Sequence, residues 1–79
     1  MSGTGRVVHV DPGTVPNTNE AAQRVLVDRP NGDRLLFFIP AGAAPPEGAA
    51  ITWGPHHASW PGRRVRKLTN EIDPDAPLR

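Results

Sequence analysis

The 79-residue chain contains no cysteine, which excludes disulfide bonds, thiolate metal sites and catalysis by a cysteine nucleophile. It also has no long apolar stretch: its first residues are small and polar, and no segment approaches the roughly 20 residues that cross a membrane. Ten prolines and eight glycines leave no room for a long helix. These absences predict a small cytoplasmic protein that is built from short strands and has no membrane partner.

Short runs of β-branched and aromatic residues lie between the prolines and glycines. The expected strands are residues 6–10, 23–28, 34–39, 49–53 and 63–68. The clearest local signal is a hairpin around Pro30, Asn31 and Gly32, where proline fixes an early turn position and the other two residues suit positive φ. The strand after this turn is apolar on both faces. This pattern predicts a central strand, covered on one side by the core and on the other by a loop or a partner.

Turn signals at roughly ten-residue spacing predict a single all-β domain over residues 1–70. The expected architecture is a small five-stranded antiparallel barrel, OB-like or else SH3-like, because barrel closure removes exposed hydrogen-bonding edges. The long connection after the third strand favours the OB type, which carries its helix there. Residues 71–79 are acidic and contain proline, and we expect them to form a flexible tail.

Positive charge is concentrated in one segment. Residues 61–70 carry a net charge of +4, whereas residues 1–60 carry −1 and residues 71–79 carry −2. In an extended strand Arg64 and Arg66 would point outward while Val65 points inward. Cations beside aromatic and imidazole rings are what a surface needs to hold a polyanion and stack on its bases. The predicted nucleic-acid contacts are Arg63, Arg64, Arg66, Lys67, Trp60, His56 and His57.

The favoured function is therefore a small non-enzymatic module that binds single-stranded DNA or RNA with little sequence specificity. The cations would engage phosphates, while Trp60 and one of the histidines stack on bases. A simpler interpretation of the basic strand is an edge strand whose charge prevents pairing with other chains. A simpler interpretation of Trp60 is a lid packed over one end of the barrel.

The alternative function is a protein-interaction module or a small subunit. In that case Phe37 or Phe38, together with Trp60, would form an apolar patch that another protein or a second copy of the chain covers. This alternative allows a homo-oligomer.

Metal binding and catalysis have weaker support. His56 and His57 are adjacent, so in extended backbone their rings point in opposite directions and do not easily share one ion. Ser59 near His57 has no orienting acid close in sequence. The sequence therefore predicts no metal, no cofactor and no catalytic residue, and an activity as an enzyme is disfavoured.

Overall fold

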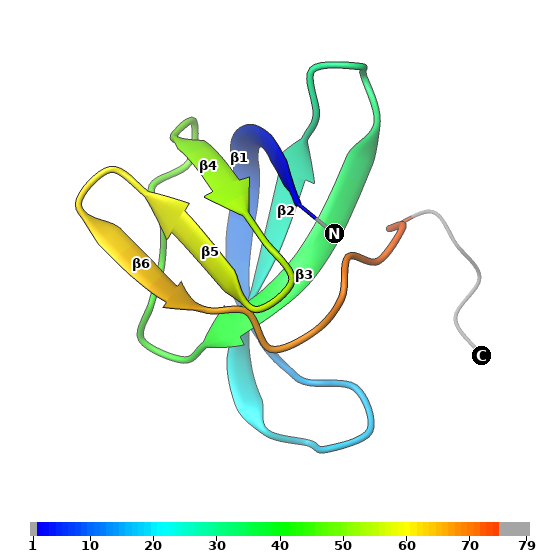
Figure 1. The fold of residues 1–79 in the computed structure, drawn as a ribbon. Helices are drawn as coiled ribbons and strands as arrows, with labels where there is room; N and C mark the ends of the chain where they lie inside the picture. Colours follow the sequence, from blue (N-terminus) through cyan, green and yellow to red (C-terminus); the bar gives the residue numbers. More distant parts are fainter. Residues whose placement is uncertain (1, 75–79) are drawn as a thin grey trace.

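The computed structural model describes residues 2–74, and within them it contains one antiparallel sheet and no helix (Figure 1). The strands are β1 (Gly3–Thr14), β2 (Ala21–Asp28), β3 (Arg34–Pro40), β4 (Ala50–Trp53), β5 (His57–Trp60) and β6 (Arg63–Arg66). They are arranged in the order β3-β2-β1-β4-β5-β6. The all-β class is confirmed. The five-stranded barrel is not, because the sheet has six strands and is not closed.

The reason for favouring an OB-type barrel also fails, since the connection between β3 and β4 forms turns and irregular chain without a helix. Residues 2–74 likewise contain no helix with the length and apolarity that crossing a membrane requires.

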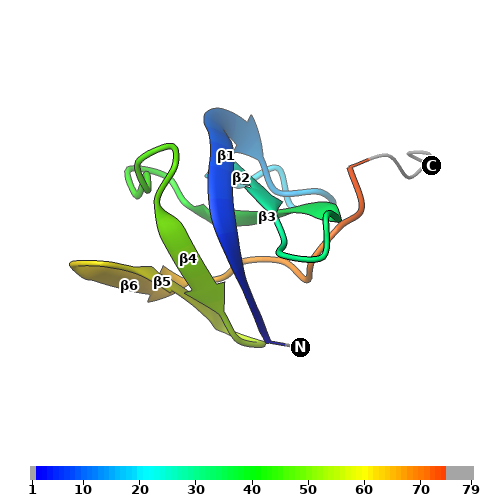
Figure 2. The same cartoon turned by 90° about the horizontal axis from the view of Figure 1, so that it is seen from above.

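The long strand β1 is shared by the two halves of the sheet (Figures 1 and 2). Residues 3–6 pair with β4, and residues 6–14 pair with β2, with a bulge between Val7 and His9. The strand was expected to span residues 6–10, but it runs from Gly3 to Thr14 and continues through Pro12 and Gly13. Strand β4 pairs only with residues 3–6 of β1, so the edge of β1 near Pro12 that faces away from β2 has no partner strand. Proline is tolerated at such an edge because no backbone N–H is needed there.

The hairpin between β2 and β3 is confirmed. The Arg29 amide donates to the Asp33 carbonyl at 2.8 Å, and the Gly32 amide donates to the Arg29 carbonyl at 3.0 Å. Gly32 has φ = 91°, whereas Asn31 does not share the positive φ that was expected of it. This is the three-residue hairpin turn that places glycine in the left-handed position. The Asn31 side chain instead accepts a hydrogen bond from the Asp33 amide at 3.0 Å.

The main core lies between the two halves of the curled sheet. Its buried residues are Val7, Val25, Val27, Leu35, Phe37, Ile39, Ala43, Ile51, Trp53, Ala58 and Trp60. The rings of Phe37 and Trp53 lie 5.6 Å apart between centroids at an angle of 51°, a geometry typical of stabilising aromatic pairs. Trp60 is only 9% exposed, so the lid interpretation describes it better than the stacking one.

Strand β5 was expected to be part of a loop. It is only four residues long, and Pro55 and Pro61 lie close to its two ends. Its alternation is nevertheless regular, because Ala58 and Trp60 are buried while His57 is exposed. Trp60 therefore enters the core for the same reason as Trp53, as an inward position of a short strand.

Strand β3 lies at the end of the sheet rather than in its centre. One of its faces packs into the main core, and Phe38 on the other face forms a second cluster with Val15 and Ala22. Leu68 and Ile72 pack against that cluster. A loop or a partner was expected to cover this second face, and the structure shows a segment of the same chain there.

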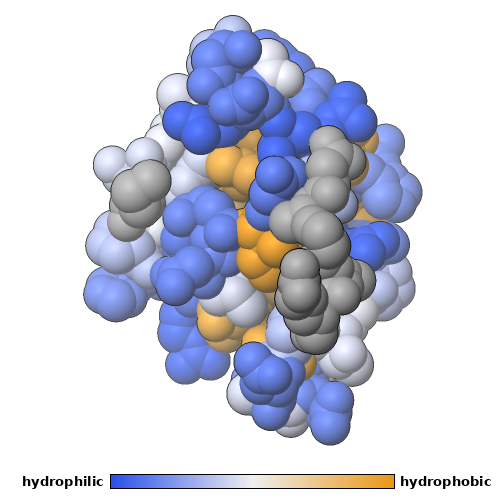
Figure 3. Space-filling model, turned by 90° about the vertical axis from the view of Figure 1, so that its right-hand side faces the viewer, coloured by the Kyte–Doolittle hydropathy of each residue, from blue (hydrophilic) through white to orange (hydrophobic). Residues whose placement is uncertain are grey.

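Residues 67–72 run beside the outer edge of β3. The Leu68 amide donates to the Phe38 carbonyl at 2.8 Å, and Leu36 and Ile72 exchange two hydrogen bonds of 2.8 Å. From this side, apolar atoms are visible as a narrow strip between polar ones (Figure 3). The expected flexible tail was to begin at residue 71, but Ile72 is bonded to the sheet, and residues 75–79 of that tail lie outside the described residues.

Candidate nucleic-acid interface

The outward face of β4, β5, β6 and the first part of β1 is polar. The strand register aligns Thr4, Thr52, Ser59 and Arg64 in one row across the four strands. Along β4 and β5, the residues of this outward face alternate with buried residues that point into the core. We call this surface the basic face, and its residues are Thr4, Arg6, Ala50, Thr52, His57, Ser59, Arg64 and Arg66.

The basic face holds arginines and no acidic residue. Arg64 and Arg66 are exposed, and neither takes part in the ion pairs formed within residues 2–74. Arg6 is also exposed, and its Nη1 donates to the Gly48 carbonyl at 2.5 Å rather than to a carboxylate. The sequence has no aspartate or glutamate between residues 48 and 70. The positive charge of this face is therefore not cancelled by its own strands.

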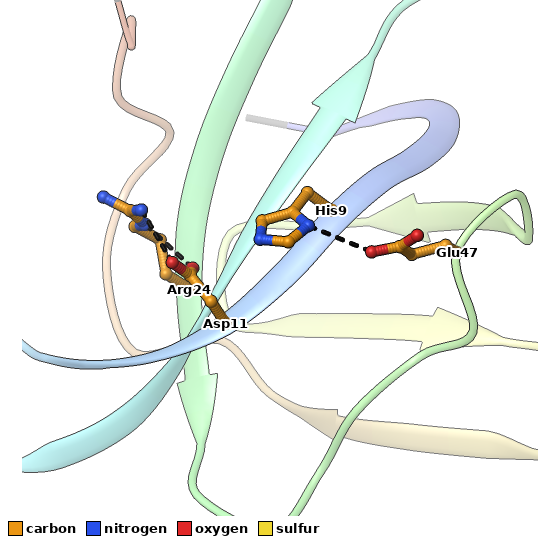
Figure 4. Close-up of polar contacts among 4 residues, drawn as sticks. All are labelled: His9, Asp11, Arg24 and Glu47. Atoms are coloured by element: carbon orange, nitrogen blue, oxygen red, sulfur yellow. Dashed lines mark hydrogen bonds and ion pairs between the residues drawn. The ribbon is translucent and has the colours of Figure 1, made fainter.

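The two arginines on strands β2 and β3 of the other half are neutralised. Arg24 binds Asp11 at 2.8 Å (Figure 4), and Arg34 binds Asp28 at 2.7 Å. The hydrogen bond from Arg24 keeps the pKa of Asp11 below its ordinary value, so this pair stays charged on both sides down to acidic pH. Among the strands of residues 2–74, the arginines outside the ion pairs thus belong to β6 and to the part of β1 that pairs with β4.

Glu47 lies at the border of the basic face, in the connection that leads to β4. Its Oε2 is 3.0 Å from Nδ1 of His9 on β1 (Figure 4). Glu47, the acidic residue nearest to β4 in the sequence, thus contacts a histidine of β1.

A hollow of about 450 Å³ opens at one end of the basic face, where β4 turns into β5. Its lining residues are Thr52, Trp53, Gly54, Pro55, His56, His57, Ser59 and Arg64. The hydroxyls of Thr52 and Ser59 are 3.0 Å apart. The structure thus brings together three of the residues predicted from sequence, His56, His57 and Arg64.

Other parts of the site were missed from sequence. Thr4 and Arg6 join the basic face only through the pairing of β1 with β4, which links residues 3–6 to residues 50–53. No local pattern reveals a register between segments so far apart in the chain. Thr52 carried one usable signal, since it alternates with the apolar Ile51 and Trp53 in a predicted strand.

Three predicted contacts do not belong to the interface. Trp60 is in the core, so it is not a platform for stacking on bases. Lys67 has a side-chain exposure of 0%; its Nζ forms an ion pair with Glu71 and lies 5.9 Å from the centroid of the Phe37 ring. Arg63 is exposed, but strand alternation places it on the side opposite to Arg64.

The aromatic patch predicted for a protein partner is not on the surface. Phe37 is 0% exposed and Phe38 is 6% exposed, and Trp60 lies in the main core. These three residues stabilise the fold, and the partner hypothesis loses the side chains on which it was based.

Within residues 2–74 no three histidine or acidic side chains are placed to hold a metal ion. Ser59 shares its hydrogen bond with Thr52 and not with a histidine, so the structure does not assemble the nucleophile–base pair that acyl transfer requires.

No family model matches the chain, and no curated protein or solved structure is significantly similar to it.

Proposed function

We propose that this protein binds nucleic acid through the sugar–phosphate backbone, with little sequence specificity. The observation that carries the proposal is the set of exposed arginines on the basic face, Arg6, Arg64 and Arg66, with no acidic side chain among them. Guanidinium groups match phosphate oxygens with two parallel hydrogen bonds. Contacts of this kind do not depend on base identity.

Because its aromatic side chains are buried, the protein is better suited to contact the sugar–phosphate backbone of a nucleic acid than to stack on its bases. Trp53 is 5% and Trp60 is 9% exposed, both phenylalanines are buried and the sequence has no tyrosine. Stacking is left to the exposed rings of His56 and His57. The proposal therefore extends to single and double strands alike, and a cytoplasmic location remains part of it because the chain has no cysteine.

Salt dependence tests the proposal. Three arginine–phosphate contacts give a slope of about −2 for log affinity against log salt on a single strand, at roughly 0.7 per contact, so affinity falls about 20-fold between 50 and 200 mM salt. We expect Arg64→Ala and Arg66→Ala each to reduce the slope by about 0.7. Fluorescence anisotropy with a labelled oligonucleotide measures both quantities.

Arg24→Ala is the matched control, because it removes the same charge from an arginine that Asp11 already neutralises. Its slope should equal that of the wild type. Equal effects of Arg24→Ala and Arg64→Ala would show that net charge alone governs binding. A wild-type affinity that does not change with salt would contradict the proposal.

A further inference from the structure

The hollow at the β4–β5 turn differs from the hollow beside Arg6, which Asp28 also lines, because no acidic residue lines it. Its volume of about 450 Å³ lies within the range of roughly 300–1,000 Å³ that is common for small-ligand sites. Its polar side chains are hydroxyls, imidazoles and a guanidinium, and none of its lining residues is an acid. A negatively charged ligand in the hollow therefore meets hydrogen-bond donors and no carboxylate that would repel it.

The backbone around the hollow is fixed by hydrogen bonds. The Gly54 amide donates to the His57 carbonyl at 2.8 Å and closes the turn between β4 and β5. The Lys67 amide donates to the His56 carbonyl at 2.8 Å, which ties the turn to the chain after β6. The two imidazoles are thus carried by a turn that is held at both ends, and less ordering is needed when a ligand binds.

The donors of the hollow lie close together. Arg64 is the register partner of Ser59, which in turn pairs with Thr52. The two hydroxyls are hydrogen-bonded at 3.0 Å. Because each hydroxyl has one hydrogen and only one is used between them, one O–H remains free to donate. Arg64 adds a fork of N–H donors that no carboxylate of the described residues occupies.

The donors of the hollow suit a terminal phosphate monoester better than an internal phosphodiester, because the two groups differ in charge and in the number of acceptor oxygens. A terminal phosphate monoester carries about −1.5 to −2 charges at pH 7 and three acceptor oxygens, whereas an internal diester carries one charge and two free oxygens. A concave cluster of guanidinium, imidazole and hydroxyl donors offers the monoester more hydrogen bonds than the diester uses.

We propose that this hollow holds the terminal phosphate monoester of a nucleic-acid strand, whose next phosphates then lie along the basic face. The inference depends on the proposed function for the strand, but the hollow by itself has the chemistry of a monoester site. A free nucleoside monophosphate is the other source of the same group. It lacks the phosphates that reach Arg6 and Arg66, so it binds more weakly.

The test compares three probes of one short sequence at a single salt concentration: an oligonucleotide with a 5′-phosphate, one with a 3′-phosphate and one with hydroxyls at both ends. We expect one phosphorylated end to bind about tenfold more tightly than the hydroxyl-ended strand. Ser59→Ala and His56→Gln should each bring this affinity ratio close to one. His9→Gln is the matched control, since His9 contacts Glu47 outside the hollow, and it should keep the ratio.

The outcomes separate the two proposals. Salt-dependent binding of all three probes with a ratio of one in the wild type overturns the monoester site and leaves backbone binding intact. If the hydroxyl-ended strand does not bind at low salt, backbone binding fails. In that case amide shifts at Ser59 and His57 on addition of a nucleoside monophosphate would sustain the monoester site, and their absence would overturn it.

Discussion

Trp60→Ala lowers the free energy of unfolding by about 3–5 kcal/mol, as expected for the removal of a large ring from a packed core. The indole is 9% exposed and belongs to the main core together with Phe37 and Trp53. A domain of this size has a total stability of only about 4–12 kcal/mol. The variant should therefore unfold at a much lower urea concentration than the wild type, which urea denaturation followed by circular dichroism measures.

Trp60→Phe separates folding from binding. It keeps an apolar ring in the core, so the fold should survive, and the affinity for an oligonucleotide should stay at the wild-type value. If Trp60 instead stacks on bases, Trp60→Phe would weaken binding and Trp60→Ala would cost little stability. That pattern would contradict the placement of the indole in the core.

Lys67→Ala should destabilise the protein by about 3 kcal/mol. It removes one partner of an ion pair whose lysine side chain is 0% exposed and whose Glu71 side chain is 16% exposed. Breaking a buried pair typically costs about 3–5 kcal/mol, and we expect the lower end because Glu71 keeps some contact with water. Lys67→Met is the control. It retains most of the apolar stem over Phe37, so it should lower the free energy of unfolding by less than Lys67→Ala.

The same pair predicts a dependence of stability on pH. Burial alone would raise the pKa of Glu71, but the hydrogen bond and charge of Lys67, together with a backbone hydrogen bond, hold it below the ordinary value of 4.5. A carboxyl group with a lowered pKa stabilises the fold above its unfolded-state pKa and loses that contribution as the pH falls through its folded-state pKa.

The Glu71 contribution to wild-type stability should therefore be complete at neutral pH and decline below about pH 4.5. Urea denaturation at several pH values measures the decline, and Lys67→Met should show less of it. An identical acid dependence in the two proteins would contradict the role assigned to this ion pair.

Local sequence patterns predicted the strands well where the alternation or the turn chemistry was strong. The Pro30-Asn31-Gly32 hairpin and the outward direction of Arg64 and Arg66 are examples. Each depends only on neighbours in the chain, which a sequence displays directly. Strand β5 was missed because a four-residue strand in a short segment between two prolines resembles a loop.

Lys67 shows a different kind of error. Its strand alternation with the inward Val65 was visible, as was Glu71 four residues later, yet the lysine was counted with the surface cations. A long side chain at an inward position with an acid nearby is the sequence signal for a buried ion pair. The part of the basic face contributed by β1 had no such signal, because the pairing of β1 with β4 is a long-range contact.

The central claim is that the basic face binds the backbone of nucleic acid, and an amide chemical-shift titration with a short single strand tests it most directly. At low salt we expect shifts at Arg6, Thr52, Ser59, Arg64 and Arg66, and none around Arg24 on β2. The shifts should fade as salt is added. No shifts at low salt, or shifts gathered on β2 and β3, would contradict the claim.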